Sequence, residues 1–168
     1  YPGATILDIT SDSQKNYAQW LSPFYPHNNI PIPFTEGLTA TCVEAVWQGL
    51  KVFENSDVDF NTFRNDTMKG LKRTVRKYGV PLGHRKGAYG KELLDYETAR
   101  KLIYIPTYKW VLDNIPCVHD TVMKIKEFSL QNDVVFLDYN TCTDISDMSK
   151  PLSHANLVRL YIEDTYPF

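Results

Sequence analysis

Glu44, Gln48 and Lys51 are the residues whose types and spacing best suit chemistry. A helix over 42–53 places them on one side, with Glu44 and Gln48 one turn apart and Glu44 and Lys51 about 10.5 Å apart along the axis. A gap of that size holds one sugar-sized group between a carboxyl group and an amine. A rigid helix bearing these groups suits proton transfer and nucleophilic attack.

The rest of this predicted helix is apolar, which anchors it in a core. Its other face carries apolar residues at i, i+3, i+4 and i+7 spacing, so we expect Trp47 and Leu50 to be buried. A second interpretation stays open. Thr41 and Glu44 have the spacing of a capping box, and Glu, Gln and Lys are the usual residues of a solvated helix face.

Two segments around these residues resemble a known superfamily. The run Leu21-Ser-Pro-Phe-Tyr25 is followed by Val43-Glu44-x-x-Trp-Gln48-x-x-Lys51-x-Phe53. Over residues 20 to 53, their order and spacing resemble the NADAR (NAD and ADP-ribose) superfamily, also called YbiA-like. The chain departs from that pattern at Pro23, at Ala45 and near its C-terminus, where 138–154 replaces a Gly-rich segment. The resemblance therefore indicates a divergent member.

The resemblance implies an N-glycosidase that hydrolyses the C1′–N bond of an ADP-ribosylated or nucleotide-like (N-ribosyl) substrate, for example by removing ADP-ribose from a modified base. Such a reaction needs a proton donor for the leaving nitrogen, and Glu44 is the candidate. The resemblance further implies that Lys51 forms an imine with the opened ribose, which requires burial to lower its usual pKa of about 10.4. Gln48 would bind a ribose hydroxyl.

Other side chains extend the predicted substrate site. Ser22 belongs to the matching segment, and Phe24, Tyr25 and Trp47 offer rings that either stack on a base or pack in the core. The expected partner is a nucleotide-like small molecule or an ADP-ribosylated substrate, a modified nucleic acid base included. The four histidines form no His-x-x-x-His or His/Cys cluster, so we expect neither a metal nor a cofactor.

Two basic segments and two aspartates complete the candidate site. A helix predicted over 66–78 places Lys69 near its positive N-terminus, and Arg85 lies in a Gly-bounded loop, so both are candidates for phosphate binding. A solvated face and a flexible loop are the alternatives. Asp138 follows the apolar run 134–137, which predicts a buried strand, and Asp147 lies in the next loop, where each binds substrate or caps a turn.

Composition predicts one α+β domain over residues 1–168, helix-dominated with a small sheet of short strands. We expect helices over 41–54, around Phe60 and Phe63, and over 66–78, 92–105, 107–114, 116–131 and 153–163; a loop over 79–90; strands over 4–10 and 134–137; and an edge strand or extended loop around Ile30–Phe34.

The bulk properties exclude few functions. A net charge of −2 gives no global reason to expect nucleic-acid or membrane binding. Three widely spaced cysteines and the lack of a long apolar run favour a reducing, cytoplasmic compartment. Two other function classes stay open: a non-catalytic ADP-ribose or nucleotide-binding module of the same fold, and an adaptor that binds through the basic residues of 69–77. Only the adaptor predicts steep salt dependence.

Overall fold

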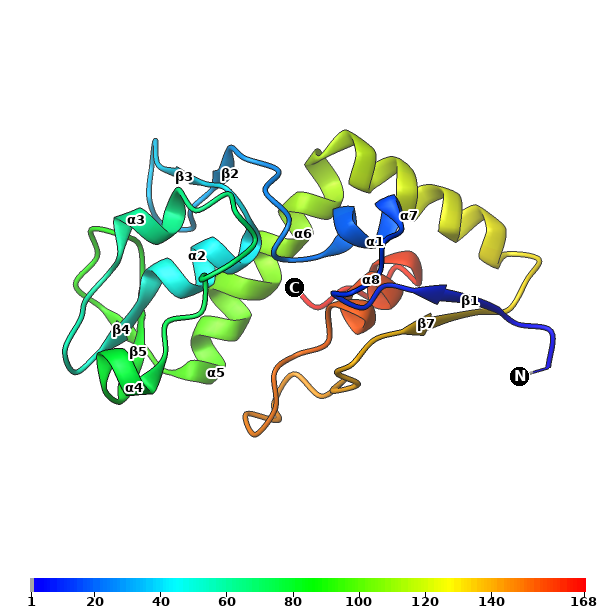
Figure 1. Cartoon of the computed structure of the whole chain (residues 1–168). Coiled ribbons are helices and arrows are strands. Elements are labelled where there is room, and N and C mark those ends of the chain that lie inside the picture. Colours follow the sequence, from blue (N-terminus) through cyan, green and yellow to red (C-terminus); the bar gives the residue numbers. More distant parts are fainter. Residues whose placement is uncertain (1) are drawn as a thin grey trace. The chain divides into compact units, whose positions relative to one another are not determined.

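The protein is α+β and helix-dominated, as its computed structural model shows for residues 2–168 (Figure 1). Its contacts divide the chain into two compact units. Residues 2–22 and Val111–Phe168 form one, which we call the terminal unit, and Pro23–Trp110 form the other, the central unit. The single domain predicted over 1–168 stays a prediction. None of the described helices is long and apolar enough to cross a membrane.

The terminal unit is built on a two-stranded parallel sheet. Strand β1 (Thr5–Asp8) pairs with β7 (Val134–Leu137), so both predicted strands are confirmed. Helices α7 (Pro116–Ser129) and α8 (His154–Ile162) are also confirmed, with Ser153 capping α8, whereas α1 (Asn16–Leu21) was not predicted. Helix α7 packs against both α1 and α8. The core includes Leu21, Val118, Val122 and Leu157.

Strand β7 differs from expectation in its burial. Its unbroken apolar run predicted a fully buried strand, but Val135 and Leu137 are 37% and 51% exposed. Exposure alternates along β7, since Val134 and Phe136 are half-buried while Val135 and Leu137 are exposed, so only one face of the strand is covered.

The central unit holds two small antiparallel sheets. In one, β2 (Ile30–Pro31) pairs with β3 (Thr39–Ala40), which confirms the expected edge strand over two residues. In the other, β4 (Lys51–Phe53), β5 (Pro81–Arg85) and β6 (Leu93–Leu94) lie in that order. Helix α2 (Val43–Leu50) packs against α3 (Phe60–Phe63), the predicted short helix.

Helix α2 confirms the predicted burial of Trp47 and Leu50, because all its residues are buried. Two details of the prediction were wrong. The cap is Cys42, whose Sγ accepts from the Ala45 N–H at 3.3 Å, while the Thr41 hydroxyl donates instead to the Asn65 carbonyl. The helix ends at Leu50, since Lys51–Phe53 leaves it to pair with β5. Glu44 is therefore neither in a capping box nor on a solvated face.

The helix predicted over 66–78 was wrong for most of its length. Only α4 (Val75–Tyr78) is helical, although Gly79 ends it as expected, with φ 85°. Met68 and Gly70 have φ near 60°, which no α-helix accommodates. Tertiary contacts outweigh local propensity here, because Arg73 is buried against residues 48–57 in a non-helical conformation.

The stretch 79–105 also differs from expectation. The predicted loop 79–90 contains β5, and the predicted helix 92–105 begins with β6, followed by α5 (Tyr96–Ala99). A π-helical turn, η1 (Arg100–Tyr104), leads without interruption into α6 (Ile105–Asn114). Pro106 therefore lies inside a continuous helical run, where it removes one i→i−4 hydrogen bond, and the π-helical turn directly before it is where the α-helical hydrogen-bonding pattern changes.

Candidate functional site

Glu44 lies at the centre of the polar residues in the central unit. Its side chain is 7% exposed, and its backbone N–H donates to the Pro23 carbonyl at 2.9 Å. The carboxylate Oε1 accepts from Gln48 Nε2 at 2.8 Å. The second oxygen, Oε2, has no hydrogen-bonding partner among the described residues. Glu44 is thus a buried acid with one oxygen free to contact a ligand.

Gln48 connects Glu44 to Arg73. Its Oε1 accepts from the Arg73 backbone N–H at 3.1 Å, and its carbonyl accepts from the Arg73 guanidinium at 3.0 Å. Because both ends of the Gln48 amide are engaged, its main role in this structure is to orient Glu44. The predicted contact with a ribose hydroxyl has the second amide hydrogen and the second lone pair of Oε1 left to use.

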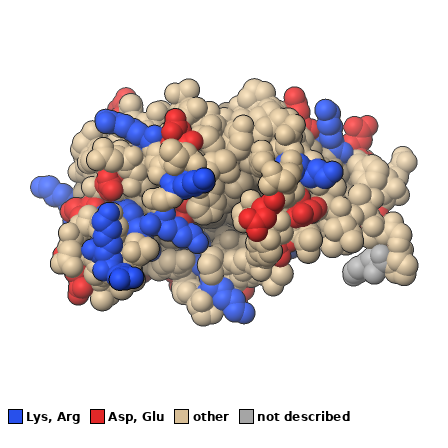
Figure 2. Space-filling model, viewed as in Figure 1, with Lys and Arg blue, Asp and Glu red and all other residues tan. Residues whose placement is uncertain are grey.

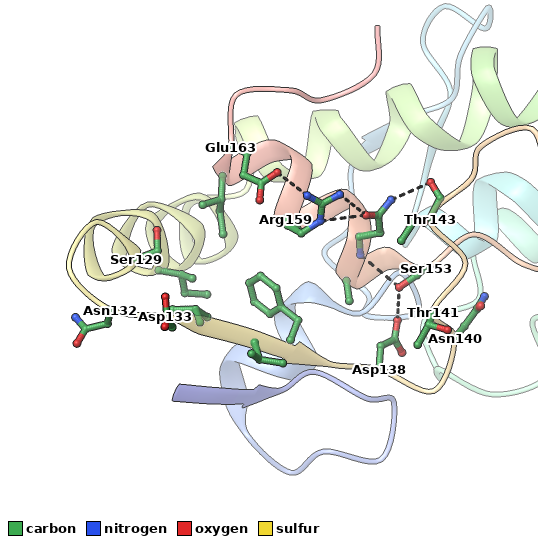
Figure 3. Close-up of a pocket in the computed structure, with 17 residues that line it drawn as sticks. Ser129, Asn132, Asp133, Asp138, Asn140, Thr141, Thr143, Ser153, Arg159 and Glu163 are labelled. Carbon is green, nitrogen blue, oxygen red and sulfur yellow. Dashed lines mark hydrogen bonds and ion pairs between the residues drawn. The ribbon is translucent and has the colours of Figure 1, made fainter. Parts of the chain in front are cut away.

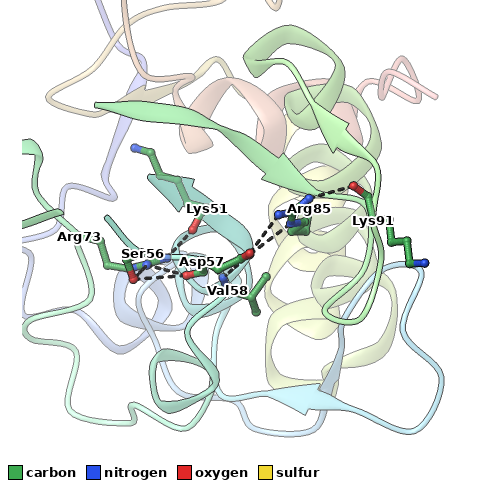
Figure 4. A network of polar contacts seen from close by, with 7 residues as sticks. All are labelled: Lys51, Ser56, Asp57, Val58, Arg73, Arg85 and Lys91. Carbon is green, nitrogen blue, oxygen red and sulfur yellow. Dashed lines mark hydrogen bonds and ion pairs between the residues drawn. The ribbon is translucent and has the colours of Figure 1, made fainter. Parts of the chain in front are cut away.

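Arg73 fixes the turn from α2 into β4. Its guanidinium donates to the Lys51 carbonyl, to Ser56 Oγ at 2.7 Å and to the Asp57 carbonyl at 2.8 Å (Figure 4). It also lies over the rings of Phe53 and Tyr78, each 4.9 Å away. This buried cation holds the backbone of Lys51 in place and adds positive charge beside the site.

Lys51 brings an amine next to this acid, from strand β4 and not from the helix. Its Nζ makes no hydrogen bond or ion pair with any described residue and lies 5.3 Å from the centre of the Phe53 ring. Figure 4 shows the side chain pointing away from the Arg73 contacts. Burial lowers the pKa of Lys51, opposed by the negative charge of Glu44 and reinforced by Arg73.

His84 faces the same place from β5. It pairs directly with Lys51 across the β4–β5 ladder, which puts the two side chains on one face of the sheet. The imidazole is 1% exposed and packs on the Trp47 ring at a centroid distance of 3.7 Å. Neither ring nitrogen makes a well-formed hydrogen bond within the described residues, and the Trp47 backbone is the one group that raises the pKa of His84, against the larger effect of burial. Buried polar groups are almost always paired, so this position is unusual.

The electrostatics of the three groups favour uncharged forms. Burial raises the pKa of Glu44, while Gln48, Lys72 and Lys51 oppose the shift. Burial, with Lys51 and Arg73 adding to it, lowers the pKa of His84 to about 3. An acid that keeps its proton more readily, an amine that loses it more readily and a neutral imidazole are together suited to proton transfer and nucleophilic attack near pH 7.

The three aromatic residues predicted to stack on a ligand or pack in the core have different surroundings. Trp47 is 8% exposed, with one face against His84 and its edges near Tyr96 and Tyr104, so it packs in the core. Phe24 and Tyr25 are half-buried, and Tyr25 lies 4.8 Å from the His27 ring. Stacking on a ligand remains a prediction for these two, whereas the core alternative holds for Trp47.

The structure gives the two predicted phosphate ligands, Lys69 and Arg85, unlike surroundings. Lys69 is exposed in a non-helical turn, so the helix N-terminus that was to assist it is absent. Arg85 donates from Nε and Nη2 to the Asp57 carboxylate at 3.1 and 2.9 Å and from Nη1 to the Lys91 carbonyl. Figure 2 shows Lys and Arg gathered on the side of the central unit that carries α4, and the segment that leads into and forms this helix has exposed cations at Lys69, Lys72, Arg76 and Lys77, which we call the basic cluster around α4.

The remaining predicted residues, Ser22, Asp138 and Asp147, belong to the terminal unit. Ser22 is buried at the end of α1. Asp138 Oδ2 accepts from Ser153 Oγ at 2.9 Å and lies 3.3 Å from His154 Nδ1. Asp147 accepts from the Ser149 N–H at 2.9 Å, which is the turn-capping alternative.

Sequence reasoning missed Arg73 and His84. Arg73 looked like one of several cations on a solvated helix, and His84 like a residue of a basic loop. No local pattern distinguishes them, because their importance comes from partners 16 to 25 residues away for Arg73 and from the β4–β5 register for His84. Among the described residues, no group of three or more His, Cys, Asp or Glu side chains is arranged to hold a metal ion.

Comparison with known proteins gives one match. A model described as a family of unknown function (DUF6939) matches residues 1–158. No curated protein and no solved structure matches the chain.

Proposed function

Because the chain belongs to a family of unknown function, DUF6939, we propose its function from the chemistry of the central unit: an N-glycosidase that hydrolyses the C1′–N bond of an ADP-ribosylated or nucleotide-like (N-ribosyl) substrate. One observation carries the proposal. The buried carboxyl group of Glu44 keeps one oxygen unpartnered beside Lys51, an amine that burial makes easier to deprotonate. The resemblance of residues 20 to 53 to the NADAR superfamily supports the same activity.

Each residue has a defined task in this reaction. Protonated Glu44 gives its proton to the leaving nitrogen through Oε2 as the C1′–N bond breaks. The Lys51 amine forms a new bond to C1′ and gives up a proton to the Glu44 carboxylate. The C1′–O4′ bond then breaks as Glu44 returns this proton to O4′, which gives an imine between Lys51 and the opened ribose, and water hydrolyses that imine to release the sugar and the free amine. Gln48 and Arg73 hold Glu44 and Lys51 in position.

The test is turnover of an N-ribosyl substrate by two variants. Glu44→Gln removes the transferable proton and keeps the contact with Gln48, while Lys51→Ala removes the nucleophile. Each variant should lose activity, by about 10² to 10⁴-fold for the proton transfer, and retain a folded circular dichroism spectrum. Full activity in Lys51→Ala rules out the imine route. Full activity in both variants rules out the proposal that these residues catalyse the reaction.

A non-catalytic module that binds ADP-ribose or a related nucleotide at this site is the second candidate. It is favoured by the departures at Pro23 and Ala45 and by Gln48, whose amide is largely occupied by Glu44 and Arg73. Calorimetric titration with ADP-ribose distinguishes the two candidates, because the module binds without turnover. Binding through the basic cluster around α4 instead predicts an affinity for nucleic acid that falls steeply with salt.

A cytoplasmic location is part of the proposal. The three cysteines, Cys42, Cys117 and Cys142, are unpaired in the structure, which suits a reducing compartment. Reducing conditions also keep the Cys42 thiol available to cap α2.

A further inference from the structure

The terminal unit has a groove that the proposed reaction does not use. It lies between β7 and α8, has a volume of about 620 Å³, and draws all its lining residues from this unit (Figure 3). Apolar side chains form much of its surface, among them Val134, Phe136 and Ile162. Aspartate, asparagine, threonine and glutamate side chains surround them, as Figure 3 shows. Such a surface is typical of a binding site.

The backbone of β7 is open along one edge. The Asp133 carbonyl accepts from the Thr5 N–H at 2.8 Å, and the Leu137 carbonyl accepts from the Ile9 N–H at 3.1 Å. Backbone groups of successive strand residues point to opposite edges, so those of Val134 and Phe136 point away from β1. In the described chain, β7 has no second neighbouring strand, which leaves these N–H and C=O groups ready to pair.

The charge around the groove is negative. Asp133, Asp138 and Glu163 line it, and the single cation among the lining residues, Arg159, already pairs with Glu163 at 2.6 Å. Asp133 and Asp138 flank β7 at its two ends. An extended segment lying beside β7 therefore meets a carboxylate at each end, and a basic side chain complements it best.

We propose that the groove binds an extended basic peptide of a partner protein, which adds to the open edge of β7 as a third strand. Backbone hydrogen bonds to Val134 and Phe136 hold the peptide, and alternate apolar side chains enter the groove. Lysine or arginine near its ends faces Asp133 and Asp138. The same charges disfavour a second copy of this chain, because antiparallel pairing of two β7 edges through Val134 and Phe136 sets Asp133 of one copy opposite Leu137 of the other, next to its Asp138.

The probe is a synthetic peptide of about seven residues, alternating Val and Thr with Lys at both ends, long enough to span β7. Hydrogen exchange of the full chain measured by NMR gives the signature. Peptide at about 1 mM should slow exchange of the Val134 and Phe136 amides about tenfold. The Val135 and Leu137 amides, which face β1, should change little. A peptide of the same sequence with Glu at both ends should give no protection.

A charge-reversed variant tests the electrostatic part. Asp133→Lys should weaken peptide binding about fivefold, as expected for reversal at an exposed position. Asp120→Lys makes the same charge change on α7 outside the groove and should leave the affinity unchanged. Equal binding of the Lys and Glu peptides, or no protection of Val134 and Phe136, overturns the proposal. So does protection that occurs without peptide and disappears on dilution, because the occupant is then a second copy.

Discussion

Each unit holds a shielded carboxyl group and a shielded histidine, but only in the terminal unit do both ring nitrogens of the histidine have polar neighbours. In the terminal unit, Asp138 binds Ser153 and lies beside His154, whose other ring nitrogen lies 3.0 Å from the Ile9 carbonyl. In the central unit, Glu44 Oε2 and both ring nitrogens of His84 have no partner among the described residues. Buried polar atoms that have hydrogen-bonding partners stabilise a fold. Buried polar atoms without partners lower the free energy of unfolding, and a ligand that pairs with them restores it.

The largest expected effect separates the two carboxyl groups by activity. Glu44→Gln should reduce N-ribosyl hydrolysis by about 10² to 10⁴-fold, because the acid is lost. Asp138→Asn should leave turnover of folded protein unchanged and lower the free energy of unfolding by about 1 to 2 kcal/mol, since the Ser153 hydroxyl loses its charged acceptor. Parallel rate and urea-denaturation measurements check both. Equal activity losses would remove the distinction between the clusters.

The next effect compares two arginines by stability. Arg73→Met should lower the free energy of unfolding by about 3 kcal/mol, because several buried carbonyl groups lose their donor. Arg159→Met is the control. Its side chain is 47% exposed and pairs with Glu163, so its loss should cost within about 1 kcal/mol. Chemical denaturation measures both free energies. Similar losses in the two variants would show that the buried contacts of Arg73 stabilise the protein no more than an exposed ion pair does.

The pH dependence of the free energy of unfolding tests whether His84 is shielded from water. Its folded-state pKa, about 3, is below the ordinary value of 6.5, so the unfolded chain takes up the proton first as the pH falls. The stability that neutral His84 contributes is complete above pH 6.5 and is lost on acidification toward pH 3, by at most about 1.4 kcal/mol per pH unit. His84→Phe should flatten this part of the stability curve. An unchanged slope would mean that His84 is solvated.

The smallest expected effects concern Lys69 and Arg85. If they contact phosphate, Lys69→Ala and Arg85→Ala should each weaken ADP-ribose binding a few-fold, while stability changes by about 0.5 to 1 kcal/mol or less. Lys124→Ala, on α7, is the matched control for removal of an exposed lysine. Calorimetric titration measures the affinity. Unaltered affinity in both variants would show that neither residue contacts phosphate, so that Lys69 is simply solvated and Arg85 serves only its ion pair with Asp57.

The sequence predicted those elements whose burial pattern is local. The apolar faces of α2, α7 and α8 and the run 134–137 were sufficient to locate these elements. The helix predicted over 66–78 failed because Arg73 gains more from the carbonyls of residues 48–57 than from helical geometry. Strand β5 was missed because its pairing with β4 depends on residues about 30 positions away.

The candidate site was predictable only in part. The proximity of Glu44, Gln48 and Lys51 followed from their spacing, even though Lys51 reaches the site from a strand. The free oxygen of Glu44, the bracing by Arg73 and the isolation of His84 depend on the register of distant segments. No pattern within the sequence contains that information.

Borohydride trapping at Lys51 tests the central claim most directly. Sodium borohydride added during turnover of an N-ribosyl substrate reduces an imine to a stable amine, and peptide mass spectrometry locates the attached sugar. We predict an adduct on Lys51 in the wild-type chain and in His84→Phe, and none in Lys51→Arg, because a guanidinium stays protonated and does not attack. Turnover without an adduct on Lys51, or an adduct on another lysine, would contradict the account.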